Sequence, residues 1–329
     1  MKKKEIPQRP DGLLEMLQQV KANYIAEQEK RKRGRPRIYP GLSILLLAVV
    51  AVVMKTFKTS ELYRLVSQDE RLREEIELAA VPHRTTVGRR LKKLLPEAEA
   101  QVNGLGQQIV TEVKPARGLP AASAIDGRMY QAQGPRWHKQ DREKGRVPPQ
   151  LRNVDTESSW LKSGYRGWVQ GYHLILQGLV FPYPVPIFAT WRANSEGEAT
   201  IVANALAEGK LPITDLLLGD ESFGGADLVA AYQEAGGWLL TSKELPKIRS
   251  SWKNDLFAYR KQTIEILFQR VIQAADLKSC PVKGLDLNGA FVIASVWIYQ
   301  NIFLSNYRKG KPLGEIKAAI ERARWRLTG

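Results

Sequence analysis

The chain has 329 residues, 43% of them hydrophobic, so it can bury a sizeable core and is not a disordered protein. Its formal net charge of +16 favours a polyanionic partner, either nucleic acid or an anionic membrane surface. The single cysteine, Cys280, excludes an internal disulfide and a cysteine-rich zinc site, and the three histidines are scattered. Any bound metal ion is therefore expected to have oxygen ligands.

The first part of the chain, to about residue 118, is predicted to be helical and basic. Residues 42–54 form the longest apolar run. The run is shorter than the ~20 residues that span a bilayer, so a buried helix is the better interpretation. No apolar stretch follows the basic N-terminus directly, as it would in a signal peptide. We therefore expect a cytoplasmic, nucleoid-associated protein with no membrane partner.

A basic ribbon at residues 31–38 contains the sequence KRGRPR. Pro36 biases the preceding residue towards an extended conformation, and Gly34 lets the backbone approach a partner closely. The segment resembles the AT-hook, whose Gly-Arg-Pro core lies in the A·T minor groove, where negative potential attracts arginine. The resemblance implies that Arg33, Arg35 and Arg37 contact DNA. A solvated basic linker is the alternative.

Residues 59–95 are a candidate helix-turn-helix, with helix starts at Ser60 and Thr85. Val87, Leu91 and Leu94 recur at helical spacing and are predicted to face the core. Four basic side chains at the start or on other faces of this last helix are candidate DNA contacts: Arg84, Arg89, Arg90 and Lys93. The alternative is an ordinary surface helix with a solvated basic face.

From about residue 119 short apolar runs alternate with amphipathic segments, which predicts an α/β domain. Strands are expected at 122–126, 173–180, 186–191, 215–219 and 238–242, and helices at 196–208, 226–235 and about 259–277. The long stretch between residues 128 and 171 is polar and rich in Arg, Lys, Trp and Tyr. It suits either a surface that lines DNA or a mobile solvated loop.

Two of the predicted buried strands lead into carboxylates that have no basic neighbour to neutralise them. Asp126 ends the first strand, and Asp220 follows the fourth. In the long helix, Glu265 lies at the border of the apolar stripe, about 20° from Ile272 at 100° per residue. Three carboxylates at one sheet edge can hold two Mg²⁺ ions for displacement at phosphorus. Taken singly, Asp220 and Asp126 are better explained as a helix cap and a turn residue.

These segments together resemble a known family. The stretches AIDGR, GYHLILQGLV, LLLGDESFGGADLVAAYQEAGGWLLTSK and YRKQTIEILFQRVIQAADLK are similar, in order and spacing, to bacterial insertion-sequence transposases of the DDE type. Such proteins have a ribonuclease-H-like catalytic domain. The resemblance implies that Asp126, Asp220 and Glu265 are the catalytic triad and bind Mg²⁺ or Mn²⁺.

The chain departs from that family near the last carboxylate. Relatives often carry Tyr and Arg seven and four residues before it and Lys seven after, where this chain has Ala258, Lys261 and Ile272. Lys261 can take the place of the arginine. The residue after the second aspartate is often basic, but here it is Glu221. These changes leave open an inactive copy.

The expected fold is α/β, a ribonuclease-H-like mixed sheet flanked by helices and preceded by a helical DNA-binding region. Residues 1–118 would form that region and residues 119–329 the catalytic domain. The expected function is cutting and joining the ends of a mobile element. The expected partners are double-stranded DNA, as terminal repeats and target, and a second copy of the chain when DNA is bound. The alternatives are a non-catalytic DNA-binding regulator and a metal-dependent nuclease without strand transfer.

Overall fold

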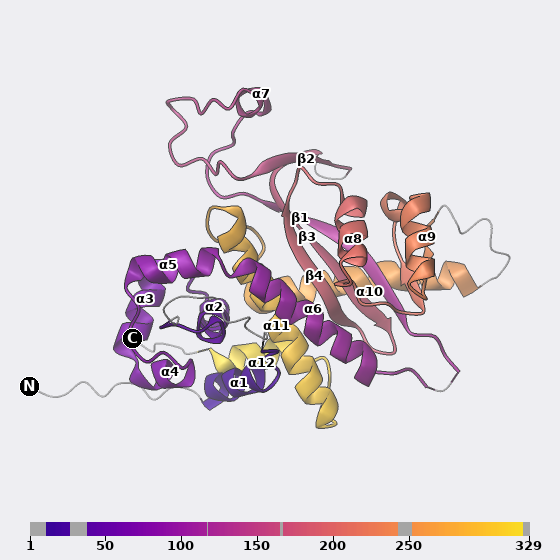
Figure 1. The fold of residues 1–329 in the computed structure, drawn as a ribbon, viewed down its shortest axis with the longest axis horizontal. Helices are drawn as coiled ribbons and strands as arrows, with labels where there is room; N and C mark the ends of the chain where they lie inside the picture. Colours follow the sequence, from indigo (N-terminus) through magenta and orange to yellow (C-terminus); the bar gives the residue numbers. More distant parts are fainter. Residues whose placement is uncertain (1–10, 27–37, 117, 165–166, 243–251, 325–329) are drawn as a thin grey trace, which may run out of the picture.

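The computed structural model describes residues 11–26, 38–116, 118–164, 167–242 and 252–324. A mixed β-sheet occupies one part of the molecule, and most N-terminal and C-terminal helices gather beside it (Figure 1). The described helices before the sheet are α1 (Asp11–Ala22), α2 (Gly41–Met54), α3 (Thr59–Gln68), α4 (Glu70–Glu75), α5 (Arg84–Lys92) and α6 (Leu95–Glu112).

The sheet is built from six strands. They are β1 (Ala122–Gln131), β2 (Ser159–Ser163), β3 (Gly167–Phe181), β4 (Val185–Ala193), β5 (Leu216–Leu218) and β6 (Trp238–Leu240). Their order is β2-β3-β1-β5-β6, and β4 also pairs with β3. Strands β2, β3 and β4 run antiparallel to their neighbours, whereas β5 is parallel to both β1 and β6. This mixed sheet with its flanking helices confirms the predicted fold class.

The remaining helices follow the strands or lie between them. They are α7 (Lys139–Glu143), α8 (Glu198–Ala207), the 3₁₀ turn η1 (Glu221–Phe223), α9 (Ala226–Glu234), α10 (Trp252–Ala275), α11 (Leu285–Arg308) and α12 (Ile316–Ala323). All five predicted strands and all three predicted C-terminal helices are present. Strands β1 and β3 are longer than predicted, and β2 was not predicted.

The two faces of the sheet are buried in different hydrophobic clusters. Helices α8 and α9 cover one face, where Ile125, Ile175 and Leu217 are buried. The other face joins a larger cluster that includes α10, α11 and the N-terminal helices. This larger core is one cluster in space, with members from Leu13 in α1 to Ala323 in α12. The helices before and after the sheet therefore share it.

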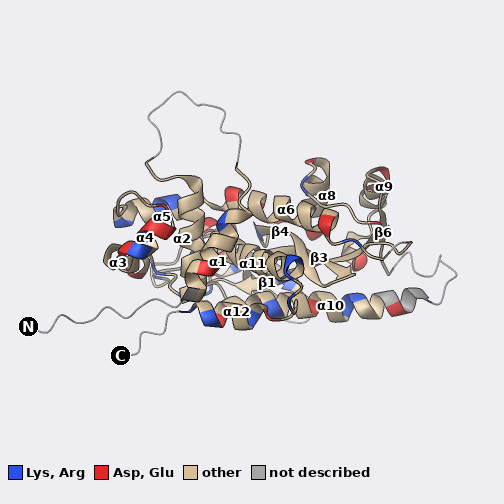
Figure 2. Cartoon of the chain, turned by 90° about the horizontal axis from the view of Figure 1, so that it is seen from below, with Lys and Arg blue, Asp and Glu red and all other residues tan. Residues whose placement is uncertain are grey.

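The most apolar helices lie inside this core. The run predicted as a buried helix forms α2, whose residues from Ser43 to Val53 are buried. Figure 2 shows charged residues along α10 and α12, whereas α2 and α11 are almost free of them. In the described part of the chain, α11 has the length and composition to cross a membrane. Helices α2 and α3, which meet at a bend of 103°, also pass this test if the two are counted together as one span. The apolar window of α11 is 100% buried within the protein.

Candidate active site

Asp126 lies on β1 just beyond its pairing with β5. That parallel pairing covers Ala122 to Ala124, while the other edge of β1 stays paired with β3. The half-buried carboxylate accepts a hydrogen bond from the backbone N–H of Gly127, with an N···O distance of 2.8 Å. Burial raises the pKa of Asp126 above its ordinary value. The Gly127 hydrogen bond and the positive charge of Arg260 oppose this shift, and the charges of Asp220 and Glu265 add to it.

Asp220 follows β5 after one glycine and caps the turn η1. Its Oδ1 accepts hydrogen bonds from the backbone N–H of Ser222 at 2.8 Å and from the Ser222 hydroxyl at 2.5 Å. The capping role considered from the sequence is therefore present. Both hydrogen bonds use the same oxygen, so capping does not prevent Oδ2 from binding a ligand. The negative charge of Asp220 adds to the rise in the pKa of Asp126.

Glu265 projects from α10 at the edge of its buried face. The predicted apolar stripe is buried as expected: Ile264, Leu267, Phe268, Val271, Ile272 and Ala275. Glu265 itself is exposed, more so than its predicted border position implied. It lines an open cavity of about 390 Å³ together with Asp126, Arg128 and Ser163. Asp220 does not line this cavity, so the structure brings two members of the predicted triad into one cavity and leaves the third beside it.

Sequence reasoning missed a fourth carboxylate, that of Glu198 in the first turn of α8. A Cβ atom on Gly127 would lie 2.0 Å from Glu198 Oε1, so Glu198 occupies the space that the glycine leaves beside Asp126. Burial, followed by the charges of Asp126 and Asp220, raises the pKa of Glu198 to about 7. Acidic residues are common in first helical turns, so nothing in the sequence distinguished Glu198 from Glu196 nearby.

Arg260 and Arg128 are cations of this site, whereas Lys261 was the residue suggested from the sequence. Lys261 is exposed. Arg260 is half-buried, and its charge acts on Asp126. Its Nε and Nη1 atoms are buried, with no hydrogen-bond partner among the described residues. A guanidinium in this state is suited to bind an anionic oxygen at the site.

The chemistry of these groups fits a hard divalent cation. All four acidic donors are carboxylates, and burial, with the neighbouring negative charges adding to it, raises the pKa of Asp126 and Glu198; a bound cation would oppose that rise. Their oxygens do not converge on one point. Within the described ranges, no group of three or more His, Cys, Asp or Glu side chains is close enough to hold a metal ion.

The candidate DNA-binding helix is α5, which packs against α3, α2 and α11. Val87, Leu91 and Leu94 are buried, as predicted. Arg84, Arg89 and Lys93 are exposed. Arg90 is half-buried and donates a hydrogen bond from Nη2 to the carbonyl oxygen of Tyr39 at 2.8 Å, so it has a structural contact. Arg33, Arg35 and Arg37 lie outside the described residues.

No known family model matches the chain, and no curated protein sequence matches it. Three solved structures are similar to it. A synaptic complex of the piggyBac transposase with hairpin DNA shares 11% identity over 95% of this chain and 77% of that one, with a TM-score of 0.41. A paired-end complex of the Mos1 transposase shares 13% identity over 86% and 84% of the two chains, with a TM-score of 0.24. The Mos1 strand transfer complex shares 12% identity over 86% and 83%, with a TM-score of 0.22.

Proposed function

We propose that the chain is a metal-dependent DNA transposase of the DDE type, which cuts the ends of its own mobile element and joins them to target DNA. The observation that carries this proposal is that Asp126 and Glu265 line one cavity, and that the charges of Asp220 and Glu265 both act on Asp126. A site that crowds carboxylates at a cost to the metal-free protein is one that gains from binding cations.

Asp126, Asp220 and Glu265 are the residues that would hold Mg²⁺ or Mn²⁺. When bound, such ions activate an attacking oxygen and offset the charge that develops on the phosphoryl oxygens. The attack by water on an end phosphate forms one phosphorus–oxygen bond and breaks another, releasing a DNA 3′-hydroxyl. That hydroxyl then attacks a phosphate of the target DNA in the same way.

The other residues of the site would serve the substrate. The half-buried Arg260, whose charge acts on Asp126, would bind a phosphate oxygen at the site. With a pKa of about 7, the Glu198 carboxyl can take up or release a proton near neutral pH, so the charge of the site adjusts as ligands enter. Exposed Arg84, Arg89 and Lys93 on α5 would contact double-stranded DNA. Two copies of the chain would pair the two ends at the nucleoid.

The test is an assay with the full chain and DNA carrying the terminal repeats that flank its gene. We expect end cleavage and joined products in Mg²⁺ or Mn²⁺, and neither in a chelator. Cleavage without joining would indicate a nuclease.

Specific DNA binding with no cleavage in either metal would indicate the non-catalytic regulator. One observation favours this second candidate: among the described side chains no three carboxylates are gathered closely enough for a metal ion.

A further inference from the structure

The stretch from the end of β1 through β2 contains two tryptophans, Trp137 and Trp160, whose indole groups hold it together. The indole N–H of Trp137 donates to the carbonyl oxygen of Arg146 at 2.9 Å, and that of Trp160 donates to the carbonyl oxygen of Trp137 at 2.7 Å. Trp137 is 6% exposed. We call residues 132–163 the arm; its helix α7 stands away from the sheet in Figure 1. Both indole N–H groups therefore make hydrogen bonds within the arm.

The base of the arm is fixed to the sheet and to α11. The Gln170 side chain accepts a hydrogen bond from the Trp137 backbone at 2.7 Å and donates one to the Ser158 hydroxyl at 2.8 Å. Buried Asp155 accepts hydrogen bonds from the Tyr172 hydroxyl at 2.8 Å and from the Gly284 backbone at 3.0 Å. Hydrogen bonds to the sheet and to the start of α11 therefore hold the base of the arm in place.

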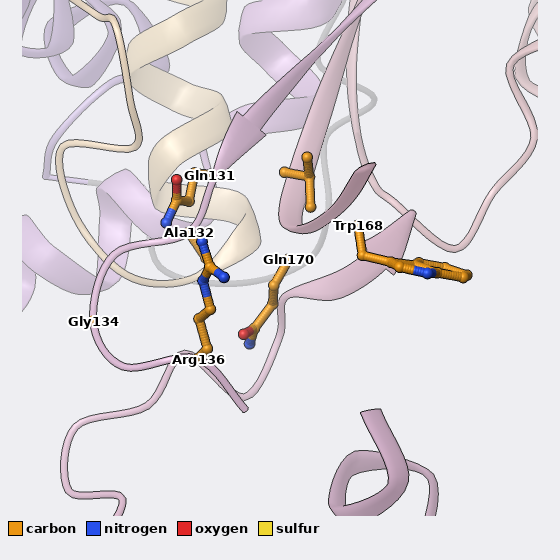
Figure 3. Close-up of a pocket in the computed structure, with 7 residues that line it drawn as sticks. Gln131, Ala132, Gly134, Arg136, Trp168 and Gln170 are labelled. Atoms are coloured by element: carbon orange, nitrogen blue, oxygen red, sulfur yellow. The ribbon is translucent and has the colours of Figure 1, made fainter. Parts of the chain in front are cut away.

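Trp168 differs from these two tryptophans because it faces outward. Its side chain is 51% exposed, and the Nζ atom of Lys139 lies 4.6 Å from the ring centroid. Trp168 also lines a cavity of about 110 Å³ (Figure 3) with Gln131, Ala132, Gly134, Arg136, Val169 and Gln170. The Arg136 guanidinium is exposed, and Lys139 Nζ also lies 3.8 Å from Glu143 Oε1 in an exposed ion pair. An aromatic face, two cations and a small cavity thus lie together.

This surface adjoins the candidate active site. Trp168 pairs with Lys162 across the β2–β3 hairpin, and the next residue of β2, Ser163, lines the cavity that contains Asp126 and Glu265. The arm is also basic, with seven Lys and Arg against four Asp and Glu between residues 132 and 163. Two of those acids, Asp155 and Glu157, accept hydrogen bonds from the backbone at the start of α11. The outward charge of the arm is therefore mainly positive.

We propose that Trp168, Arg136 and Lys139 form a platform for an unpaired nucleotide of the DNA next to the cleavage site. The base stacks on the exposed indole face, and the two cations contact the adjoining phosphates. Paired bases inside a duplex hide their faces against one another, so an unpaired or frayed base is the form of DNA that this surface fits. The proposal rests on the proposed function, because it assigns a subsite to that DNA.

The test compares binding of two labelled DNA duplexes by the full chain in a chelator, where no cleavage occurs. One duplex is blunt, and the other has a single-stranded overhang of about four nucleotides. We expect Trp168→Ala to bind the overhang about tenfold more weakly than wild type and the blunt duplex equally well. Trp168→Phe should restore most of the loss, because it keeps an aromatic face.

The matched control is Trp238→Ala. Trp238 is 62% exposed and lies on β6, at the opposite edge of the sheet from β2, so its loss should change neither affinity. An unchanged overhang affinity in Trp168→Ala would overturn the proposal. An equal loss on both duplexes would also overturn it, since Trp168 would then touch only paired DNA. Binding is measured without metal, so failure of cleavage in the assay above would leave this result independent.

Discussion

At the scale of single residues, Glu198 packs against Gly127, so that the charges of Asp126 and Asp220 act on its half-buried carboxyl. In the metal-free protein Glu198 has a pKa of about 7, against an ordinary value of 4.5. As pH rises from about 4.5, this group ionises in the unfolded chain before it ionises in the folded one. Folding stability therefore falls between about pH 4.5 and 7 and stays lower above that.

Glu198→Gln should remove this part of the pH dependence. In a chelator, the free energy of unfolding of the variant should gain on wild type by up to about 3 kcal/mol between pH 4.5 and 7.5. Urea unfolding across that range measures it, with Glu196→Gln as the control because Glu196 is exposed. If Glu198→Gln follows the wild-type pH profile, then Glu198 does not titrate near neutrality.

The sequence predicted only those site residues whose positions follow from local pattern. Asp126 and Asp220 were found because each comes directly after an apolar run, and Glu265 because it borders a helical stripe. Glu198 and Arg260 join the site through packing of α8 and α10 against β1, which no local pattern encodes. The capping role of Asp220 was considered from the sequence as the alternative, and the structure contains it: Oδ1 accepts a hydrogen bond from the Ser222 backbone.

At the scale of elements, strand β2 shows why the sheet was not fully predicted. Ser159–Ser163 reads SWLKS, with neither an apolar run nor a strict alternation, and it is a strand because β3 extends beyond β4 and offers it an open edge. The helix-turn-helix prediction gave the start of α5 to within one residue but not the short helix α4 that precedes it. The N-cap of α5 is the exposed His83, whose Nδ1 accepts a hydrogen bond from the backbone N–H of Thr85.

Substitutions on helix α5 should distinguish residues that recognise DNA bases from residues that pack against the protein. Replacing Arg84 and Arg89 with Ala should reduce discrimination between element ends and random DNA, because each direct base contact is worth about 1–3 kcal/mol. Both side chains are exposed, so folding should be unaffected. Competition binding with the two DNAs measures the ratio. A parallel loss on both would mean that these arginines contact phosphates only.

Arg90→Ala provides the contrast on the same helix. It removes the hydrogen bond to the Tyr39 carbonyl, so it should lower the free energy of unfolding by about 1–3 kcal/mol. Thermal and urea unfolding measure this. Equal stability to wild type would show that the contact contributes nothing to the fold.

The base of the arm should depend on Asp155, which is 3% exposed. Asp155→Ala leaves the Tyr172 hydroxyl and the Gly284 N–H without their acceptor, so we expect a loss of about 2–4 kcal/mol in unfolding free energy. Asp141→Ala, on α7 at the far end of the arm, should change stability by less than about 0.5 kcal/mol. Similar effects of the two substitutions would contradict the anchoring role of Asp155.

At the scale of the whole molecule, the helices before and after the sheet share one core. Phe291 of α11 is fully buried, and its ring centroid lies 5.3 Å from that of Phe57, which comes before α3. Glu99 of α6 accepts hydrogen bonds from the Thr190 hydroxyl and the Trp191 backbone, both at 2.8 Å, which links α6 to β4. Residues on both sides of the predicted domain boundary at residue 118 therefore pack against one another. The boundary itself stays a prediction.

Phe291→Ala should therefore destabilise the N-terminal helices and the sheet together. The expected cost is about 3–5 kcal/mol, as for other buried aromatic side chains. Unfolding followed by fluorescence and by hydrogen exchange of both regions should show one shifted transition. Two separate transitions, with only the N-terminal helices affected, would support two independently stable domains.

The central claim is that Asp126, Asp220 and Glu265 act together as the catalytic carboxylates. Its most direct test is the rate of end cleavage in Mg²⁺ by Asp126→Asn, Asp220→Asn and Glu265→Gln, each checked for folding and for binding to the element end. The account predicts that each variant binds the end as wild type does and cleaves at least about a hundredfold more slowly, because each loses a charge needed to hold the metal. Asp227→Asn, at an exposed position on α9, should cleave normally. Cleavage at the wild-type rate by any of the three variants would contradict the account, and if that variant were Glu265→Gln, Glu221 would be the next residue to test.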